Sequence, residues 1–221
     1  MKSSKRYKFK TNTDWYPQIF YTEKRLYTHF NNIGADKEDI VIFIDGSFSK
    51  KGVVFNNIAG AGIVVYYQDQ RYEYARPLGE TEILYAEQFA LAQSFYLLKK
   101  LKIPTWKKRI IICTDNETTF KGVYSIRKIP TYPKLMMEIK KQMFQRLDQA
   151  QVLLHKVKAH TNIIIKGNDF ADKCAKTGRI HSSILWTETP SDPNCFLGSL
   201  CDYYTRCSHR MLLWHPSRGV D

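Results

Sequence analysis

Two aspartates stand where short apolar stretches of the chain end. Asp45 follows the Val-Ile-Phe-Ile run of residues 41–44 and precedes a Gly-Ser pair, and Asp115 follows a similar run over 109–114. An apolar run bounded by turn residues predicts a buried strand, and open α/β sheets place their chemistry at the carboxyl ends of strands. Two carboxylates brought together there repel, and a divalent cation is the usual relief. Asp45 alone is also consistent with a simple turn, since Asp before Gly often begins one.

Glu87 adds a third carboxylate in an unusual position. Residues 82–102 contain no Gly or Pro, and their apolar side chains recur at helical spacing, at Ile83, Ala86, Ala90, Leu97 and Leu101. Glu87 falls on this apolar face, where an unpaired charge is costly to bury. We therefore expect Glu87 to meet a cation or a metal, unless it lies at the edge of the apolar stripe and reaches solvent.

The elements that must position these carboxylates alternate between strand and helix. The strands predicted over 41–44, 59–67 and 71–78 are joined by short connections and form an antiparallel meander. The helix over 82–102 then leads to a strand at 109–114, and a right-handed crossover makes that strand parallel to the first. A helix, a proline-bearing loop and a long amphipathic helix follow within 116–149, then a strand over 152–157 and a last helix ending near Gly178.

Two glycines in the second predicted strand, Gly60 and Gly62, indicate a close approach between strands rather than phosphate binding. They are not followed by the helix that a dinucleotide-binding fingerprint requires. A nucleotide-cofactor site is therefore not expected.

The charge of the chain favours a polyanionic partner. The chain has 221 residues and a formal net charge of +13, which counts as +4 for residues 1–38, +9 for 39–177 and 0 for 178–221. The excess lies on the probable domain, as expected for a protein that binds nucleic acid. Solubility is the alternative role of such a surface.

Targeting signals and a disulfide framework are not evident in the sequence. No apolar run approaches the roughly 18 residues that span a bilayer, and the N-terminus lacks a secretory signal. The five cysteines are odd in number and scattered. We expect a soluble, intracellular protein without a membrane partner.

Four motifs, taken in order, resemble the ribonuclease H family across about residues 39–178. They are Ile44-Asp45-Gly46-Ser47, Ala86-Glu87, Cys113-Thr114-Asp115-Asn116, and Val157-Lys158-Ala159-His160 followed by Gly167-Asn168-Asp169-Phe170-Ala171-Asp172. The fine pattern is most similar to the ribonuclease H domains attached to retrotransposon reverse transcriptases.

The resemblance implies an α/β fold with a five-stranded mixed sheet, three strands antiparallel and then two parallel, and helices on both faces. It implies an endoribonuclease that hydrolyses the RNA strand of RNA·DNA hybrids, with two Mg²⁺ ions, or Mn²⁺ as a substitute, held by Asp45, Glu87, Asp115 and Asp169. Such hard oxygen ligands suit these ions and argue against zinc. His160 matches a histidine that positions water or passes a proton.

The chain departs from the family pattern just before Glu87. Residues 81–84 are Thr-Glu-Ile-Leu, where many members carry amides that contact 2′-hydroxyls. Recognition of the hybrid is then expected from Gly46, Ser47 and Asn116. The loop over 124–133 lacks the basic helical handle of some bacterial members, which shifts substrate binding to Arg127, Lys128 or the basic N-terminus.

Three segments are expected: a basic, aromatic N-terminal extension (1–38), the catalytic domain (39–178) and a C-terminal tail (179–221). The aromatic side chains of the extension either contact nucleic acid or pack on the domain. In the tail, Cys195, Cys201, Cys207 and His209 invite a zinc site, but their spacings are not those of known fingers or ribbons.

The expected partners are an RNA·DNA hybrid and a reverse transcriptase or another retroelement protein. Two other functions stay open at this point. One is a nucleic-acid-binding relic that does not cut, and the other is a nuclease of the same fold with another substrate. Cleavage assays on hybrid, duplex DNA and duplex RNA separate the three.

Overall fold

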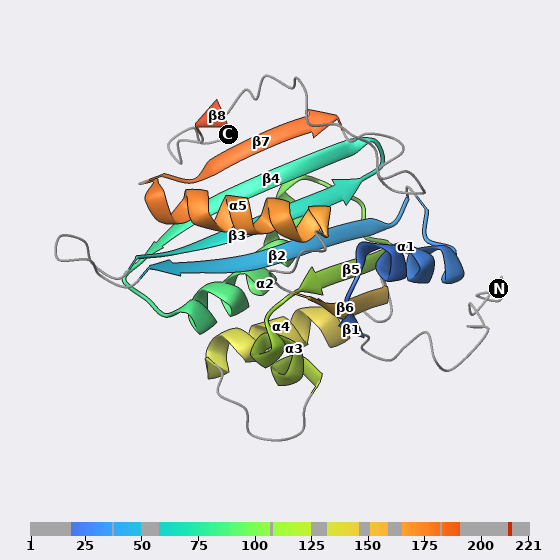
Figure 1. Ribbon diagram of the computed structural model, residues 1–221, viewed down its shortest axis with the longest axis horizontal. Helices are drawn as coiled ribbons and strands as arrows, with labels where there is room; N and C mark the ends of the chain where they lie inside the picture. Colours follow the sequence, from blue (N-terminus) through green and yellow to red (C-terminus); the bar gives the residue numbers. More distant parts are fainter. Residues whose placement is uncertain are drawn as a thin grey trace, which may run out of the picture.

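The fold is an eight-stranded sheet with helices on both sides (Figure 1). The computed structural model describes residues 19–36, 38–49, 58–106, 108–124, 132–145, 151–158, 165–181, 183–190 and 212–213. In chain order the elements are β1 (Ile19–Phe20), α1 (Glu23–Asn32), β2 (Ile40–Ser49), β3 (Ile58–Tyr67), β4 (Gln70–Gly79), α2 (Ile83–Lys100), β5 (Arg109–Thr114), α3 (Glu117–Tyr124), α4 (Pro133–Gln145), β6 (Gln151–Val157), α5 (Lys166–Ile180), β7 (Leu185–Pro190) and β8 (Leu212–Leu213).

The strand order is β1-β6-β5-β2-β3-β4-β7-β8. β2, β3 and β4 form the predicted antiparallel meander, and β5 and β6 continue the sheet in parallel from β2. These five central strands confirm the expected mixed sheet. The prediction of only five strands was wrong, because β1 adds to the β6 edge, and β7 and β8 extend the β4 edge.

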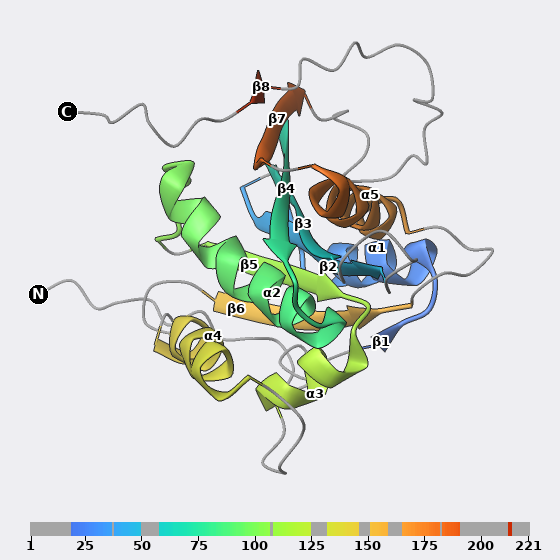
Figure 2. The same cartoon turned by 90° about the vertical axis from the view of Figure 1, so that its left-hand side faces the viewer.

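Helices cover both faces of the sheet (Figure 2). Side chains of β2 alternate between the faces: Ile42 and Ile44 pack in the core that includes α2 and α4, and Phe43 packs in the core that includes α1 and α5. A central strand buried on both faces reads as a continuous apolar run, as residues 40–44 do. No helix in the described ranges is long and apolar enough to cross a membrane.

The glycines of β3 let helix α5 approach the sheet closely. A Cβ atom on Gly62 would lie 2.1 Å from the carbonyl oxygen of Ala171 and 2.3 Å from the nitrogen of Ala175. The prediction of a close approach between strands was therefore wrong about the neighbour, because the backbone that approaches Gly62 belongs to helix α5. Since Gly62 pairs with Asp45, this contact places α5 beside the first candidate carboxylate.

The N-terminal extension packs on the sheet through β1 and α1. Phe20 and Phe30 are buried in the core on the α5 side, while Tyr21 is 50% exposed. Arg109, at the start of β5, donates to the carboxylate of Asp39 and to the carbonyl oxygens of Ile33 and Gly34 at the end of α1. Packing thus accounts for Phe20 and Phe30. Residues 1–18 lie outside the described part of the chain.

Candidate active site

Asp45, Glu87 and Asp115 converge from three elements. One carboxylate oxygen of each lies within 4.8 Å of the others. The parallel pairing of Ile44 with Thr114 aligns β2 with β5, so that the residues that follow, Asp45 and Asp115, lie at the same level of the sheet. The sequence-based expectation that these three side chains share one site is consistent with this geometry.

Asp45 does not end its strand, which corrects the expectation that Gly46 and Ser47 turn the chain away. β2 continues to Ser49, paired with β3 as far as Ile58. Only the pairing with β5 stops, at Ile44, because β5 ends at Thr114 and the chain enters α3. The sheet therefore opens between β2 and β5, and the site lies at this opening.

Gly46 allows helix α2 to bring Glu87 into the opening. A Cβ atom at Gly46 would lie 2.7 Å from the backbone nitrogen of Glu87 and 2.9 Å from its Cγ atom. Glu87 is 4% exposed. The edge position that would let Glu87 reach solvent is therefore excluded, and its carboxylate is buried as the helical pattern predicted.

Burial and neighbouring carboxylates raise the pKa of Asp45 and of Glu87. Burial, followed by the charges of Asp115 and Asp172, raises the pKa of Asp45 to about 8. Burial, followed by the charges of Asp45 and Asp115, raises the pKa of Glu87 well above its usual value. Within the described residues, no salt bridge neutralises Asp45, Glu87 or Asp115. A cation from outside the chain would relieve this repulsion.

The donor set fits a hard divalent ion. All donors in the cluster are carboxylate oxygens, and Glu87 Oε2 is buried without a hydrogen-bond partner. Mg²⁺ and Mn²⁺ prefer such ligands, whereas structural zinc prefers Cys and His. The residues present therefore fit the metal ion expected from the sequence.

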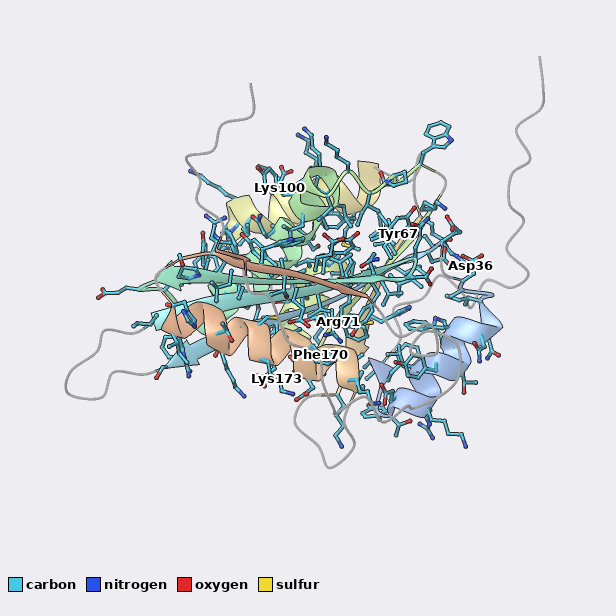
Figure 3. The ribbon with its side chains drawn as sticks, turned by 90° about the horizontal axis from the view of Figure 1, so that it is seen from above. Asp36, Tyr67, Arg71, Lys100, Phe170 and Lys173 are labelled. Carbon is cyan, nitrogen blue, oxygen red and sulfur yellow. The ribbon has the colours of Figure 1, made fainter. Side chains whose placement is uncertain are left out.

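Helix α5 presents a further set of polar side chains to the cluster. Asn168 Nδ2 donates to Asp115 Oδ2 at 3.0 Å. Phe170 points instead toward β4, where the guanidinium carbon of Arg71 lies 4.2 Å from its ring centroid (Figure 3). Together these two contacts define how α5 is rotated about its axis.

This rotation turns Asp172, rather than Asp169, toward the cluster. Asp172 follows Asn168 by four residues and so lies on the same helix face, and its charge contributes to the raised pKa of Asp45. Asp169 is one residue after Asn168 and accepts from Lys173 Nζ at 2.7 Å. Among the described residues, the cluster with oxygens within 4.8 Å consists of Asp45, Glu87 and Asp115, so neither Asp169 nor Asp172 belongs to it.

Asp172 lay within the quoted motif, but the sequence analysis selected Asp169. The carboxylate of Asp172 pairs with Lys176 at 2.6 Å, and the side chain of Asp172 is 17% exposed, against 32% for that of Asp169. Asp172 follows Asn168 by four residues, and this helical spacing is the sequence signal that could have identified Asp172.

The expected substrate contacts lie beside the carboxylates. The backbone of Gly46 packs directly against Glu87, and Ser47 is 7% exposed. Asn116 Oδ1 accepts from the backbone N–H of Thr119 at 2.7 Å and so caps the start of α3. His160, Arg127 and Lys128 lie outside the described residues, as do Cys195, Cys201, Cys207 and His209.

The sequence profile of the family described as RNase H matches residues 37–180. No match was found among curated proteins.

Solved structures of similar chains include LC11-RNase H1, from a metagenomic compost sample, in complex with an RNA/DNA hybrid (17% identity, 64% of this chain and 97% of that one, TM-score 0.48). RNase H1 of the archaeon Halobacterium salinarum is 15% identical (63% of this chain, 96% of that one, TM-score 0.46). The protease-reverse transcriptase of prototype foamy virus is 25% identical over 66% of this chain and 21% of that one, with a TM-score of 0.49.

Proposed function

The chain belongs to the RNase H family, and from this premise we propose that it is a metal-dependent endoribonuclease that hydrolyses the RNA strand of RNA·DNA hybrids. The observation that carries the proposal is the cluster of Asp45, Glu87 and Asp115, whose oxygens lie within 4.8 Å of one another and lack a cation among the described residues. Hydrolysis of a phosphodiester is the chemistry for which such a cluster is suited.

Asp45, Glu87, Asp115 and Asp172 would hold two Mg²⁺ ions, with Mn²⁺ as a substitute. Such ions, when bound, make water a better nucleophile and stabilise the leaving oxygen. The chain contributes the positions of the ligands: Asn168 holds the Asp115 carboxylate, and the bare backbone of Gly46 admits Glu87. His160 is proposed to position water or pass a proton.

Asp172 takes the place that the sequence analysis assigned to Asp169. The proposal rests on the shared helix face of Asn168 and Asp172 and on the charge that Asp172 places near Asp45. Replacing Asp172 with Asn is expected to lower hybrid cleavage far more than the matched Asp169→Asn change. Equal losses would contradict this choice, and so would a larger loss from Asp169→Asn.

Hybrid substrate is proposed from the family and from the basic charge of residues 39–177. Gly46, Ser47 and Asn116 border the carboxylates and are proposed to contact the substrate. We further propose that the chain acts as the ribonuclease H domain of a retroelement, with a reverse transcriptase as its partner, and that the catalytic domain spans residues 39–178.

Cleavage of three labelled duplexes tests the function. Hybrid, duplex DNA and duplex RNA are each incubated with the full chain, with and without Mg²⁺. We expect the RNA strand of the hybrid to be cut only with the metal, and the Asp115→Asn variant to cut orders of magnitude more slowly while keeping its fold. Tight binding of the hybrid without cleavage would refute the proposal and favour a non-cutting relic. Cleavage of another duplex instead would reassign the substrate.

A further inference from the structure

We propose that Lys158, together with Tyr21 of the N-terminal extension, forms a second contact for the substrate and binds the phosphate backbone of the duplex beside the carboxylate cluster. This inference deepens the proposed function and rests on it. Tyr21 lies before residue 37, where the match to the family begins. The ring of Tyr21 would therefore be an addition made by the extension, whereas Lys158 lies within the matched residues.

Strand register places the pair at the level of the cluster. Four parallel strands lie side by side in the order β1, β6, β5, β2. In this register Val157 and Phe20 continue the row of Asp45 and Asp115, and Lys158 and Tyr21 come one residue later. Neighbouring strands are about 4.8 Å apart, so β1 lies about 10 Å from β5. A duplex carries one phosphate about every 3.4 Å along each strand. A duplex bound at Asp115 would therefore extend past Lys158.

The pair is held firmly by the fold. The backbone N–H of Lys158 donates to the carbonyl oxygen of Phe20 at 2.9 Å, which brings Tyr21 next to Lys158. The Lys158 ammonium lies 6.0 Å from the centroid of the Tyr21 ring, a cation–π distance. Phe20, 5% exposed, and Leu26, fully buried, anchor the segments on either side of Tyr21. The position of the pair is therefore fixed by contacts among the described residues.

The charge around the pair suits a polyanion. Lys158 is exposed, and within the described residues it forms no salt bridge. Lys24 and Arg25, also exposed, begin α1 just after Tyr21. The neighbouring carboxylate, Glu23, is 5% exposed and accepts from Tyr27 and from the backbone of Lys166. The exposed charges of Lys24 and Arg25 beside the pair are thus positive, and the exposed Glu117 at the start of α3 is paired with Lys121.

The proposed site requires cations outside the carboxylate cluster to attract the substrate, and Lys158 lies where such a cation is needed. The carboxyl groups of Asp45, Glu87, Asp115 and Asp172 offer no positive charge of their own to the phosphates of a substrate. Cations outside the cluster must therefore supply part of the attraction, and phosphate contacts set the position of a protein on a duplex without reading its sequence. Lys158 supplies the charge. The exposed ring of Tyr21 orients the ammonium and covers one side of the contact.

Hybrid binding by Lys158 variants tests the inference. The full chain with Asp115→Asn serves as the background, so that the duplex stays intact, and the dissociation constant is measured over a series of salt concentrations with Mg²⁺ present. Lys158→Ala should weaken binding roughly tenfold and reduce the slope of log K against log salt by about 1, as expected for one lost phosphate contact. Lys158→Arg should keep the slope.

Lys99→Ala is the matched control. Lys99 is also exposed and lies in the last turn of α2, twelve residues and so about 18 Å along the helix from Glu87. It should leave the slope unchanged. Tyr21→Ala should weaken binding less than Lys158→Ala and also leave the slope unchanged, because it removes no charge. Melting temperatures confirm that each variant is folded.

The outcomes separate the inference from the function on which it rests. If the unaltered chain cleaves the hybrid and Lys158→Ala behaves like Lys99→Ala, the inference is overturned and the proposed function stands. If the unaltered chain neither binds nor cleaves the hybrid, both are overturned. Cleavage by the unaltered chain together with a reduced slope for Lys158→Ala alone supports both.

Discussion

Asp39 and Asp45 have the same exposure and opposite surroundings. Both are 5% exposed, one just before β2 and the other within it. The carboxylate of Asp39 accepts from Arg109 Nε at 3.0 Å and Nη2 at 2.6 Å, and from the backbone N–H of Asp36 at 2.9 Å. The carboxylate of Asp45 instead faces those of Glu87 and Asp115.

The difference separates a structural carboxylate from a functional one. A buried negative charge is stable only when it is paired. Arg109 pairs with Asp39 and at the same time holds the end of α1 on the sheet. Around Asp45 the described part of the chain supplies further carboxylates instead of a cation, so the balancing charge must come from outside. Burial alone would not have distinguished the two residues.

The largest expected effect is on catalysis and belongs to Asp45. Asp45→Asn removes a proposed metal ligand, and hybrid cleavage should fall about a hundredfold or more. Its folded state should be as stable as that of the unaltered chain, because the change also removes charge repulsion. Initial cleavage rates at equal concentrations of folded protein measure this. Asp39→Asn is the control and should keep its rate per folded molecule; retained activity in Asp45→Asn would break the comparison.

Metal binding should depend on Asp45 and not on Asp39. Mg²⁺ at a hundred times its dissociation constant should stabilise the unaltered chain by about 2.7 kcal/mol for each ion that binds to the folded state alone. Thermal unfolding with and without Mg²⁺ measures the increment. Asp39→Asn should keep the full increment, whereas Asp45→Asn should lose most of it. An equal increment in Asp45→Asn would place the ion elsewhere.

Stability should depend on Asp39. Asp39→Asn leaves the Arg109 guanidinium without its ion-pair partner, and the free energy of unfolding should fall by about 1–3 kcal/mol. Urea unfolding monitored by circular dichroism gives the value. Asp45→Asn is the reciprocal control, and its free energy of unfolding should not fall. If the unfolding curve of Asp39→Asn matches that of the unaltered chain, Arg109 does not hold α1 in the way described.

The smallest effect concerns His155, a buried group that the chain keeps neutral. Burial, followed by the neighbouring His29, lowers the pKa of His155 from 6.5 to about 3, and both of its ring nitrogens are buried without hydrogen-bond partners. Below pH 6.5 the unfolded chain takes up a proton that the folded chain does not, so stability is lost as the pH falls.

The contribution of His155 should be about 1 kcal/mol between about pH 6.5 and about pH 5.5. Urea midpoints over this range measure the decline, and His155→Leu should reduce it. The same decline in His155→Leu would show that other groups cause it.

The central sheet could be predicted because its strands carry strong local signals. The apolar runs of β2 and β5 are bounded by turn residues, and the helix of Glu87 has a clear apolar period. β1 and β8 have two residues each and offer no period to detect. β7 lies within the segment expected as a C-terminal tail, and its proline, Pro190, stands at the end of the strand, where it interrupts no pairing inside it.

α1 was missed for a different reason. Thr22 accepts from the backbone of Arg25 and caps the helix, and Leu26 and Phe30 follow at a spacing of four. These signals are present in the sequence. The aromatic and basic content of the extension was weighed instead, and it does not reveal which aromatic rings pack inward.

The sequence alone determined the order of the elements and the approximate place of the carboxylates, because both depend on local patterns of apolar and polar residues. It identified Asp45, Glu87 and Asp115, which lie within one cluster. Only the tertiary structure distinguishes the surroundings of Asp39 from those of Asp45, and the proposal of Asp172 in place of Asp169 rests on tertiary contacts as well. The reason is that helix rotation and the position of Arg109 depend on contacts between residues distant in the chain, such as Asn168 with Asp115 and Arg109 with Asp39.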